Sequence, residues 1–270
     1  MDLNDVEAVL RPARGEDIAP DATPLAGGTW LFSEPQPGLR RLLDLAGLGW
    51  DRLEPSEAGL HIGAMCTFRD LGQFAAPPAW RAARLFPRCC DALVASFKVQ
   101  EVATVGGNLC LALPAGPVAA LAVALDGVCL VRGVSGSERR VAATNFVTGD
   151  RRTMLAPGEL LRAIHLPARS LCRPAAFRRL SLSPTGRSAA LVIGTAGDRF
   201  ALTVTAATTR PVHLVFPGIP GAATLQHALG AAIPDALLHD DVHGDPAWRR
   251  HVAEVLAEEI RQELGDAACS

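Results

Sequence analysis

Short apolar runs bounded by glycine and proline recur along the first two thirds of the chain. Apolar runs of about four to eight residues between turn residues are typical of strands, and they predict strands at residues 24–26, 39–45, 60–64, 128–131 and 160–166. Apolar residues spaced three or four apart predict helices, at residues 4–10, 68–74, 79–97 and 119–125. Pro87 lies inside the third of these helices and is expected to kink or break it.

The last third of the chain has its own pattern. Gly197-Asp198 separates apolar runs at 190–195 and 199–206, which predicts an antiparallel hairpin. A final helix is predicted with Asp245 as N-cap and Pro246 in its first turn, and with one apolar face made of Trp248, Val252, Val255, Leu256, Ile260 and Leu264.

The helical and strand periodicity stops between residues 168 and 174, which we interpret as a domain boundary. We predict an α+β chain with a first domain at 1–168, in two lobes of about 1–57 and 58–168. A smaller α+β domain, an antiparallel sheet plus helices, is predicted at 172–270.

Charge and composition limit the classes of partner. The chain has 270 residues, 49% of them hydrophobic, and a formal net charge of -2, so long-range charge gives no reason to expect nucleic acid or an anionic membrane. Its longest apolar stretches, such as 119–125, are far shorter than the roughly 20 residues of a membrane-spanning helix. The first residues lack the features of a secretion signal. We therefore expect a cytoplasmic protein without a transmembrane segment.

The sequence lacks the motifs of several common cofactor sites and active sites. The seven cysteines include no C-x-x-C pair, and the dinucleotide, P-loop, serine-hydrolase and zinc-protease motifs are missing. His239 and His243 flank two aspartates, but Pro234 and the Gly244-Asp245-Pro246 segment leave little room for a helix that would align the two imidazoles. We predict no metal site and no catalytic acid–base pair in this chain.

Two glycine turns remain as candidate anion-binding segments, Ala26-Gly27-Gly28-Thr29 and Thr104-Val105-Gly106-Gly107-Asn108. Glycine allows the backbone to approach an oxyanion closely and adopts the positive φ that backbone anion nests need. The side chains of Thr29, Thr104 and Asn108 can add hydrogen bonds. A single Gly-Gly pair is weak evidence, because most such pairs are ordinary turns.

The order of the motifs resembles the FAD-binding subunits of molybdenum hydroxylases, such as the medium subunit of aerobic carbon monoxide dehydrogenase and the flavin domain of xanthine dehydrogenase. The resemblance rests on both glycine turns, on Ile62-Gly63-Ala64 followed by Thr67 and Asp70-Leu71, on Leu125-Asp126-Gly127-Val128, and on the stretch from Phe146 through Thr153, Leu155, Pro157 and Glu159 to Leu161. Phe177-Arg178 and Thr209-Arg210-Pro211-Val212 also match, and the second glycine turn is the most specific motif.

The resemblance implies a two-lobed FAD-binding domain followed by the smaller domain, and an oxidoreductase subunit that passes electrons from partner iron–sulfur clusters to an acceptor. It implies partners that carry the iron–sulfur clusters and molybdopterin, in a heterotrimer or a dimer of heterotrimers. By the same resemblance, non-covalent FAD would be held by Leu25, Ala26, Gly27, Gly28, Thr29, Trp30, Leu31, Thr104, Val105, Gly106, Gly107, Asn108, Leu161 and Arg178.

The chain departs from the family pattern in two respects. Pro117 stands near the place where the family has a carboxylate, and a proline nitrogen cannot donate a hydrogen bond. The chain has no tyrosine to stack on the flavin, which leaves Val94, Trp30 or Phe97 to cover the ring. Two alternatives therefore stay open, a flavin-free scaffold subunit that kept the fold and a standalone flavin oxidoreductase.

Overall fold

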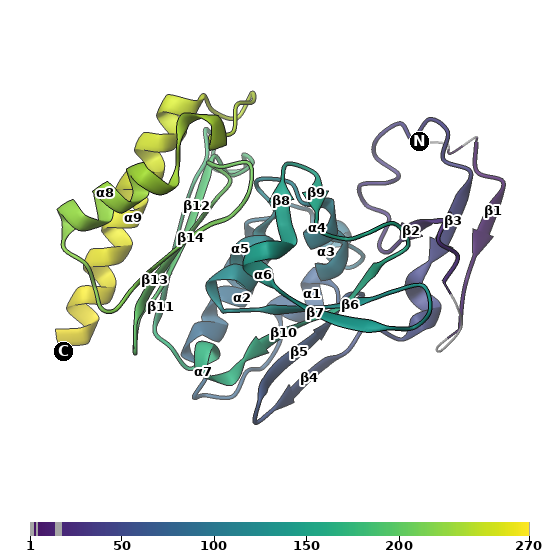
Figure 1. Ribbon diagram of the computed structural model, residues 1–270, viewed down its shortest axis with the longest axis horizontal. Helices are drawn as coiled ribbons and strands as arrows, with labels where there is room; N and C mark the ends of the chain where they lie inside the picture. Colours follow the sequence, from purple (N-terminus) through teal and green to yellow (C-terminus); the bar gives the residue numbers. More distant parts are fainter. Residues whose placement is uncertain (1–2, 4, 14–17, 270) are drawn as a thin grey trace.

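The computed structural model describes residue 3, residues 5–13 and residues 18–269. In this part of the chain the strands form three main sheets and one two-stranded ribbon. Figure 1 shows the three-stranded sheet at one end of the molecule and the four-stranded sheet, with the two C-terminal helices, at the other. The five-stranded sheet and the central helices lie between them. The predicted α+β class is confirmed.

The first sheet is parallel, with β3 (Arg41–Asp44) between β1 (Ala8–Leu10) and β2 (Thr23–Leu25). The helix predicted at 4–10 is therefore wrong for residues 8–10, and Asn4 lies outside the described residues. A helix of about seven residues is unstable without tertiary packing, whereas pairing with β3 satisfies the backbone of β1. The short 3-10 helix η1 (Leu45–Leu48) follows β3, and Leu45 and Leu48 belong to a small hydrophobic cluster beside this sheet.

The second sheet is antiparallel. Its strands lie in the order β4 (Leu53–Ser56), β5 (Gly59–Gly63), β10 (Leu160–Pro167), β6 (Val128–Arg132) and β7 (Glu138–Ala142). Strands β6 and β7 form a hairpin. One face of the sheet packs against the central helices and contributes to the largest hydrophobic core.

The first helix after β5 begins where the sequence predicts. Thr67 caps α1 (Phe68–Gly72), because its hydroxyl oxygen accepts a hydrogen bond from the Asp70 N–H. The Asp70 carboxylate in turn accepts from the Thr67 N–H, and the two bonds together form a capping box. The single kinked helix predicted over 79–97 is wrong, because this region contains η2 (Arg81–Arg84), α2 (Leu85–Asp91) and α3 (Phe97–Gln100). Pro87 is the third residue of α2, where its missing N–H costs no intrahelical hydrogen bond.

The four-stranded antiparallel sheet contains β11 (Ala175–Leu180), β12 (Ala190–Thr195), β13 (Phe200–Thr205) and β14 (Val212–Phe216). The hairpin predicted around Gly197-Asp198 is confirmed by the β12–β13 pairing. Every residue of β12 and β13 is buried, because α5 (Pro117–Ala124) packs on one face of the sheet and α9 (Pro246–Cys269) on the other.

The C-terminal helix α9 begins as predicted, with Asp245 Oδ1 accepting from the Trp248 N–H at 2.9 Å. Its apolar face packs on the four-stranded sheet, although Val255 is 43% exposed and does not belong to that face. The remaining elements are α4 (Val105–Leu111), α6 (Ala143–Phe146), β8 (Val147–Gly149), β9 (Arg152–Thr153), α7 (Ala168–Leu171), α8 (Ala222–Ala232) and η3 (Asp235–Leu237).

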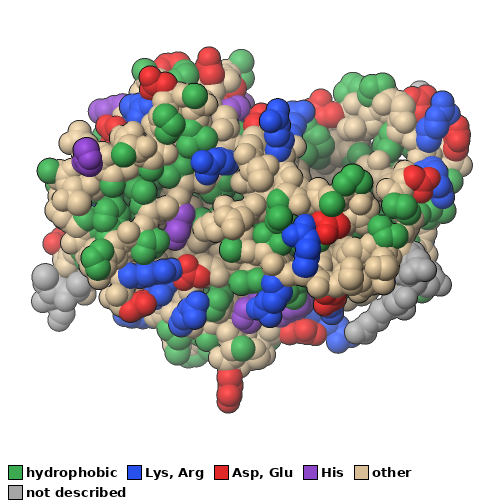
Figure 2. Space-filling model, viewed as in Figure 1, with side chains coloured by type: hydrophobic (Ala, Val, Ile, Leu, Met, Phe, Trp, Pro, Cys, Tyr) green, Lys and Arg blue, Asp and Glu red, His purple; other side chains and the backbone are tan. Residues whose placement is uncertain are grey.

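The distribution of charged side chains on the surface agrees with the small net charge. Figure 2 shows basic and acidic side chains interspersed on one face, and a hollow between the end formed by β1–β3 and the centre of the molecule. Among the described residues, no helix combines the length and the apolar composition needed to span a membrane. The same residues contain no group of three or more histidine, cysteine or acidic side chains placed to hold a metal ion.

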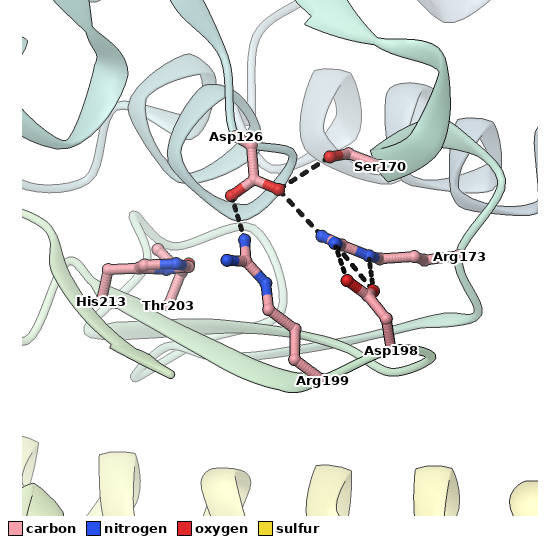
Figure 3. A network of polar contacts seen from close by, with 7 residues as sticks. All are labelled: Asp126, Ser170, Arg173, Asp198, Arg199, Thr203 and His213. Carbon is pink, nitrogen blue, oxygen red and sulfur yellow. Dashed lines mark hydrogen bonds and ion pairs between the residues drawn. The ribbon is translucent and has the colours of Figure 1, made fainter. Parts of the chain in front are cut away.

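Asp126 joins the central helices to the four-stranded sheet (Figure 3). Its carboxylate accepts from Ser170 Oγ at 2.7 Å and from Arg173 Nη1 at 2.8 Å, and it also pairs with Arg199. Arg173 bonds to Asp198 as well. Burial alone would raise the pKa of Asp126, but the Ser170 hydrogen bond and the two arginines outweigh it and lower that pKa.

We expect Asp126→Asn to lower the free energy of unfolding by about 2 kcal/mol at pH 7, since it removes the anion shared by Arg173 and Arg199, whose side chains are 7% and 30% exposed. Asp198 remains as a partner of Arg173. Because the folded-state pKa of Asp126 is lowered, its contribution is present above the unfolded pKa near 4 and is lost as pH falls through the folded value. Urea unfolding at several pH values measures both effects. Asp198→Asn is the matched control, because the Asp198 side chain is 71% exposed and should change stability little.

Candidate functional site

A cavity of about 550 Å³ lies between the part of the chain around the three-stranded sheet and the central helices. This volume is within the range of roughly 300–1,000 Å³ that is usual for small-molecule sites. Its wall includes the loop after β2, the start of α4, Leu113, Ala115 and Gly116 before α5, and the first residues of β10. Twelve of the fourteen predicted site residues line it: Leu25, Ala26, Gly27, Gly28, Thr29, Trp30, Leu31, Thr104, Gly106, Gly107, Asn108 and Leu161.

The first glycine turn has the geometry that an anion site needs. Gly28 has a φ of +69°, in the left-handed region that favours glycine. The backbone N–H groups of Gly27, Gly28 and Thr29 form no hydrogen bond with any part of the chain that the structure describes. A Cβ on Gly27 would overlap the Val102 carbonyl, so glycine also lets this turn pack directly on the segment before α4. Three neighbouring donors at the cavity wall therefore remain available to a ligand.

The second glycine turn differs from its prediction. Gly106 and Gly107 belong to the first turn of α4, and neither has a positive φ. Their N–H groups are already used, by the Ala64 carbonyl at 2.8 Å and by Thr104 Oγ1 at 3.0 Å. A Cβ on Gly106 would collide with Ala64. The expected positive-φ nest is thus wrong here, and Gly106 allows α4 to pack closely on Ala64, the residue after β5.

Asn108 and Pro117 form one local arrangement. Pro117 is the first residue of α5, a position that has no intrahelical use for an N–H, so its missing donor costs the helix nothing. Asn108 Oδ1 accepts from the Val118 N–H at 3.2 Å. It therefore acts as an N-cap of α5, although it precedes that helix by several residues. The Asn108 side chain therefore fixes the start of α5 at the cavity wall.

Two charged side chains line the cavity within the described chain, Glu159 and Arg187. Arg139 donates to both carboxylate oxygens of Glu159, at 2.7 and 2.6 Å. These hydrogen bonds lower the pKa of Glu159 to about 2, so it is ionised and neutralised by Arg139. Burial raises the pKa of the Cys110 thiol, which also lines the cavity, to about 12, and this cysteine is therefore a neutral wall residue.

The structure places the other two predicted residues elsewhere. Val105 is 1% exposed and packs into the main core. Arg178 does not line the cavity, because its guanidinium pairs with Glu259 and Glu263 on α9, at 2.9 and 2.8 Å. Sequence reasoning instead missed Arg187, nine residues further along. Its exposed position in a loop without periodicity gave no signal in the sequence.

Of the three side chains proposed to cover a ring, one lies at the cavity. Trp30 lines it, and the Arg151 guanidinium carbon lies 5.0 Å from the centre of a Trp30 ring, within cation–π range. Val94 and Phe97 are not part of the wall, and Phe97 is 73% exposed.

Residues 3–169 match the protein family described as the FAD binding domain in molybdopterin dehydrogenase, and this chain belongs to that family. The carbon monoxide dehydrogenase medium chain of Afipia carboxidovorans is 33% identical over 156 residues, which cover 56% of this chain and 52% of the relative. Xanthine dehydrogenase of Oryza sativa subsp. japonica is 28% identical over 121 residues, 43% of this chain and 9% of the relative. The matched part thus spans about half of the first relative and a small part of the second.

Solved structures show the same fold over the whole chain. Quinoline 2-oxidoreductase from Pseudomonas putida 86 has a TM-score of 0.82 at 20% identity, with all of both chains covered. Carbon monoxide dehydrogenase from Hydrogenophaga pseudoflava has a TM-score of 0.77 at 21% identity, covering 94% of this chain and 96% of the other. The predicted fold type is therefore confirmed.

Proposed function

We propose that this chain is the FAD-binding electron-transfer subunit of a molybdenum hydroxylase complex of the xanthine dehydrogenase type. The observation that carries the proposal is the run of unpaired N–H groups at Gly27, Gly28 and Thr29 on the wall of a cavity of ligand size. Such donors suit the FAD diphosphate, because main-chain N–H groups are fixed dipoles that bind oxyanions. The remaining wall is mainly apolar and suits the flavin and its ribityl chain.

In the proposed complex a molybdopterin subunit oxidises the substrate, and an iron–sulfur subunit relays the electrons to FAD, which passes them to an acceptor. FAD supplies the redox chemistry, while this chain binds it, orients it and sets the charge around it. The described residues offer no metal cluster of their own, so the other cofactors are assigned to partners. We also propose a domain division near residue 168, with the FAD-binding part before it.

Three flavins test the binding site. We expect the purified chain to show flavin absorbance, or to bind added FAD at one per chain, and to bind FAD at least about tenfold more tightly than riboflavin, which lacks the diphosphate. One tenfold step corresponds to about 1.4 kcal/mol, within the range of a few charge-assisted hydrogen bonds. Quenching of flavin fluorescence gives the three affinities, with FMN as the intermediate case.

The same measurements separate the alternatives. A colourless chain that binds none of the three flavins would support a flavin-free scaffold subunit, while equal affinity for FAD and riboflavin would contradict the role of the first glycine turn. Isolation of the tagged chain from its native cell, followed by iron and molybdenum analysis, separates a subunit from a standalone flavin oxidoreductase. Co-purification with both metals supports the complex, and flavin turnover by the isolated chain without them contradicts it.

A further inference from the structure

One contact joins the two parts of the chain between which the cavity lies. Trp30, in the loop after β2, is part of the cavity wall. Arg151, in the turn between β8 and β9, is exposed and does not line the cavity. The Arg151 guanidinium carbon lies 5.0 Å from the centre of a Trp30 ring. Because Arg151 is exposed and Trp30 belongs to the wall, this contact lies at the outer edge of the cavity.

Trp30 belongs to a hydrogen-bonded loop that also contains the first glycine turn. Its carbonyl accepts from the Ser33 N–H at 3.0 Å and from Ser33 Oγ at 2.9 Å. The Gly28 carbonyl accepts from the Phe32 N–H at 2.9 Å. Trp30 directly follows Thr29, the last of the three residues whose N–H groups stay unpaired within the described chain. A contact that holds the Trp30 ring therefore also holds these three N–H groups at the cavity wall.

The backbone of Arg151 adopts a conformation that is unfavourable for arginine. Its φ of +54° lies in the left-handed region, where a Cβ crowds the following carbonyl and glycine is preferred. The turn is nevertheless fixed, because the Arg151 N–H donates to the carbonyl of Ala112, at the end of α4, at 2.9 Å. The β8–β9 ribbon lies beside α4 (Figure 1), the helix whose first turn lines the cavity. Strain of this kind is common at positions where a side chain has a function.

Separation of the two sides of the cavity would break the contact. The loop after β2 lies on one side, and α4 with the β8–β9 ribbon lies on the other, with the hollow of Figure 2 between these parts of the molecule. At an exposed site, a cation–π contact shifts such an equilibrium by a factor of roughly two to five. Because Arg151 lies outside the cavity, the contact involves no ligand atom and forms with or without a ligand.

We propose that Arg151 is a positioning residue of the cofactor site: through the Trp30 ring it holds the loop after β2 near the β8–β9 ribbon, and so limits how fast FAD enters and leaves. This inference rests on the proposed function. The contact opposes entry and exit equally, since both require the same opening of the cavity. Arg151 therefore sets the two rate constants but not their ratio, which is the affinity.

The test measures FAD binding and release by stopped-flow flavin fluorescence. We expect Arg151→Gln, which removes the cation, to raise both rate constants about threefold and to leave the dissociation constant unchanged. Arg151→Lys keeps a cation and should stay close to wild type. In a Trp30→Leu background, Arg151→Gln should have no further effect, because its partner is already missing. Arg152→Gln is the matched control, since Arg152 is the next exposed arginine of the same ribbon and does not line the cavity.

A further variant separates this role from a general contribution to stability. Arg151→Gly removes the side chain and relieves the left-handed conformation, so its unfolding should need the same urea concentration as wild type or a higher one. FAD should nevertheless enter and leave it about threefold faster. Lower stability together with wild-type rate constants would show that Arg151 has only a structural role.

A measurement without ligand keeps this inference separate from the proposed function. A loop that is released more often exposes its N–H groups to water more often, so hydrogen exchange at Phe32 and Ser33 should be about threefold faster in Arg151→Gln. Unchanged hydrogen exchange, or wild-type rate constants for FAD, would overturn the inference. Faster release with proportionally weaker affinity would also contradict it, because it places Arg151 in direct contact with FAD. If the wild-type chain takes up no FAD, the proposed function is wrong, and hydrogen exchange still decides whether Arg151 holds the loop.

Discussion

Gly27→Ala is expected to weaken FAD binding by about 100-fold, the loss of about 2.8 kcal/mol that follows when one or two hydrogen bonds to a charged group are broken. The added Cβ would overlap the backbone carbonyl of Val102, and a carbonyl in the backbone cannot rotate away as a flexible side chain can. The first glycine turn must therefore move away from the segment before α4. This movement displaces the three unpaired N–H groups from the cavity wall.

The expected loss of stability is smaller, about 1–3 kcal/mol for overpacking of this kind. A domain of ordinary stability, about 5–15 kcal/mol, would remain folded. Urea unfolding and fluorescence titration with FAD, carried out on the same preparation, measure the two effects separately. Gly218→Ala serves as control, because a Cβ at this exposed glycine meets no atom within 4 Å. Wild-type affinity in a folded Gly27→Ala variant would show that the turn does not hold the ligand.

Arg249→Met is expected to lower the free energy of unfolding by about 3–5 kcal/mol, the range for breaking a buried ionic arrangement. Arg249 is 1% exposed, on α9, and its guanidinium donates to the carbonyls of Ala189 and Ala206 at 2.6 and 2.8 Å. It also donates to the Gly244 carbonyl and pairs with Asp241. Methionine keeps the apolar stem but leaves these acceptors without a donor.

The neighbouring residue provides the control for this prediction. Arg250 lies on the same helix but pairs with Asp235, whose side chain is 95% exposed, so Arg250→Met should cost less than about 1 kcal/mol. Equal losses of stability in the two variants would contradict the structural role of Arg249. Because Ala189 ends the loop that carries Arg187, Arg249→Met should also reduce the order of that loop. Hydrogen exchange of residues 181–189 measures this effect.

Asp241 has a structural role, although the sequence around it is rich in metal-ligand residue types. The histidines and aspartates at 239–243 contain metal-ligand residue types, but Asp241 instead accepts from the His243 N–H at 2.9 Å and pairs with Arg249. The prolines and the glycine around the segment predicted that it would not form a helix, and residues 239–243 are not helical. The sequence contained no signal for the buried arginine, because a single arginine in an amphipathic helix usually faces water.

Elements with a strong local signal could be predicted from the sequence. The Gly197-Asp198 hairpin, the Thr67 capping box and the Asp245 N-cap depend on residues close together in the chain, so their spacing is sufficient. Strand β1 and the helices over 79–97 were mispredicted, because their local signals are weak. Residues 8–10 form a strand because they pair with β3, and residues 79–97 form separate short helices because they pack against the central core.

Part of the candidate site could also be predicted from the sequence, and part of it could not. By itself the sequence determined the family, the fold type and the first glycine turn, since these depend on residue types in a fixed order. Only the tertiary structure decided that the N–H groups of Gly106 and Gly107 are already hydrogen-bonded, that Arg178 pairs with α9, and that Arg187 reaches the cavity. Each of these outcomes is a contact between segments far apart in the chain, and residue spacing carries no information about which distant group satisfies a given donor or charge.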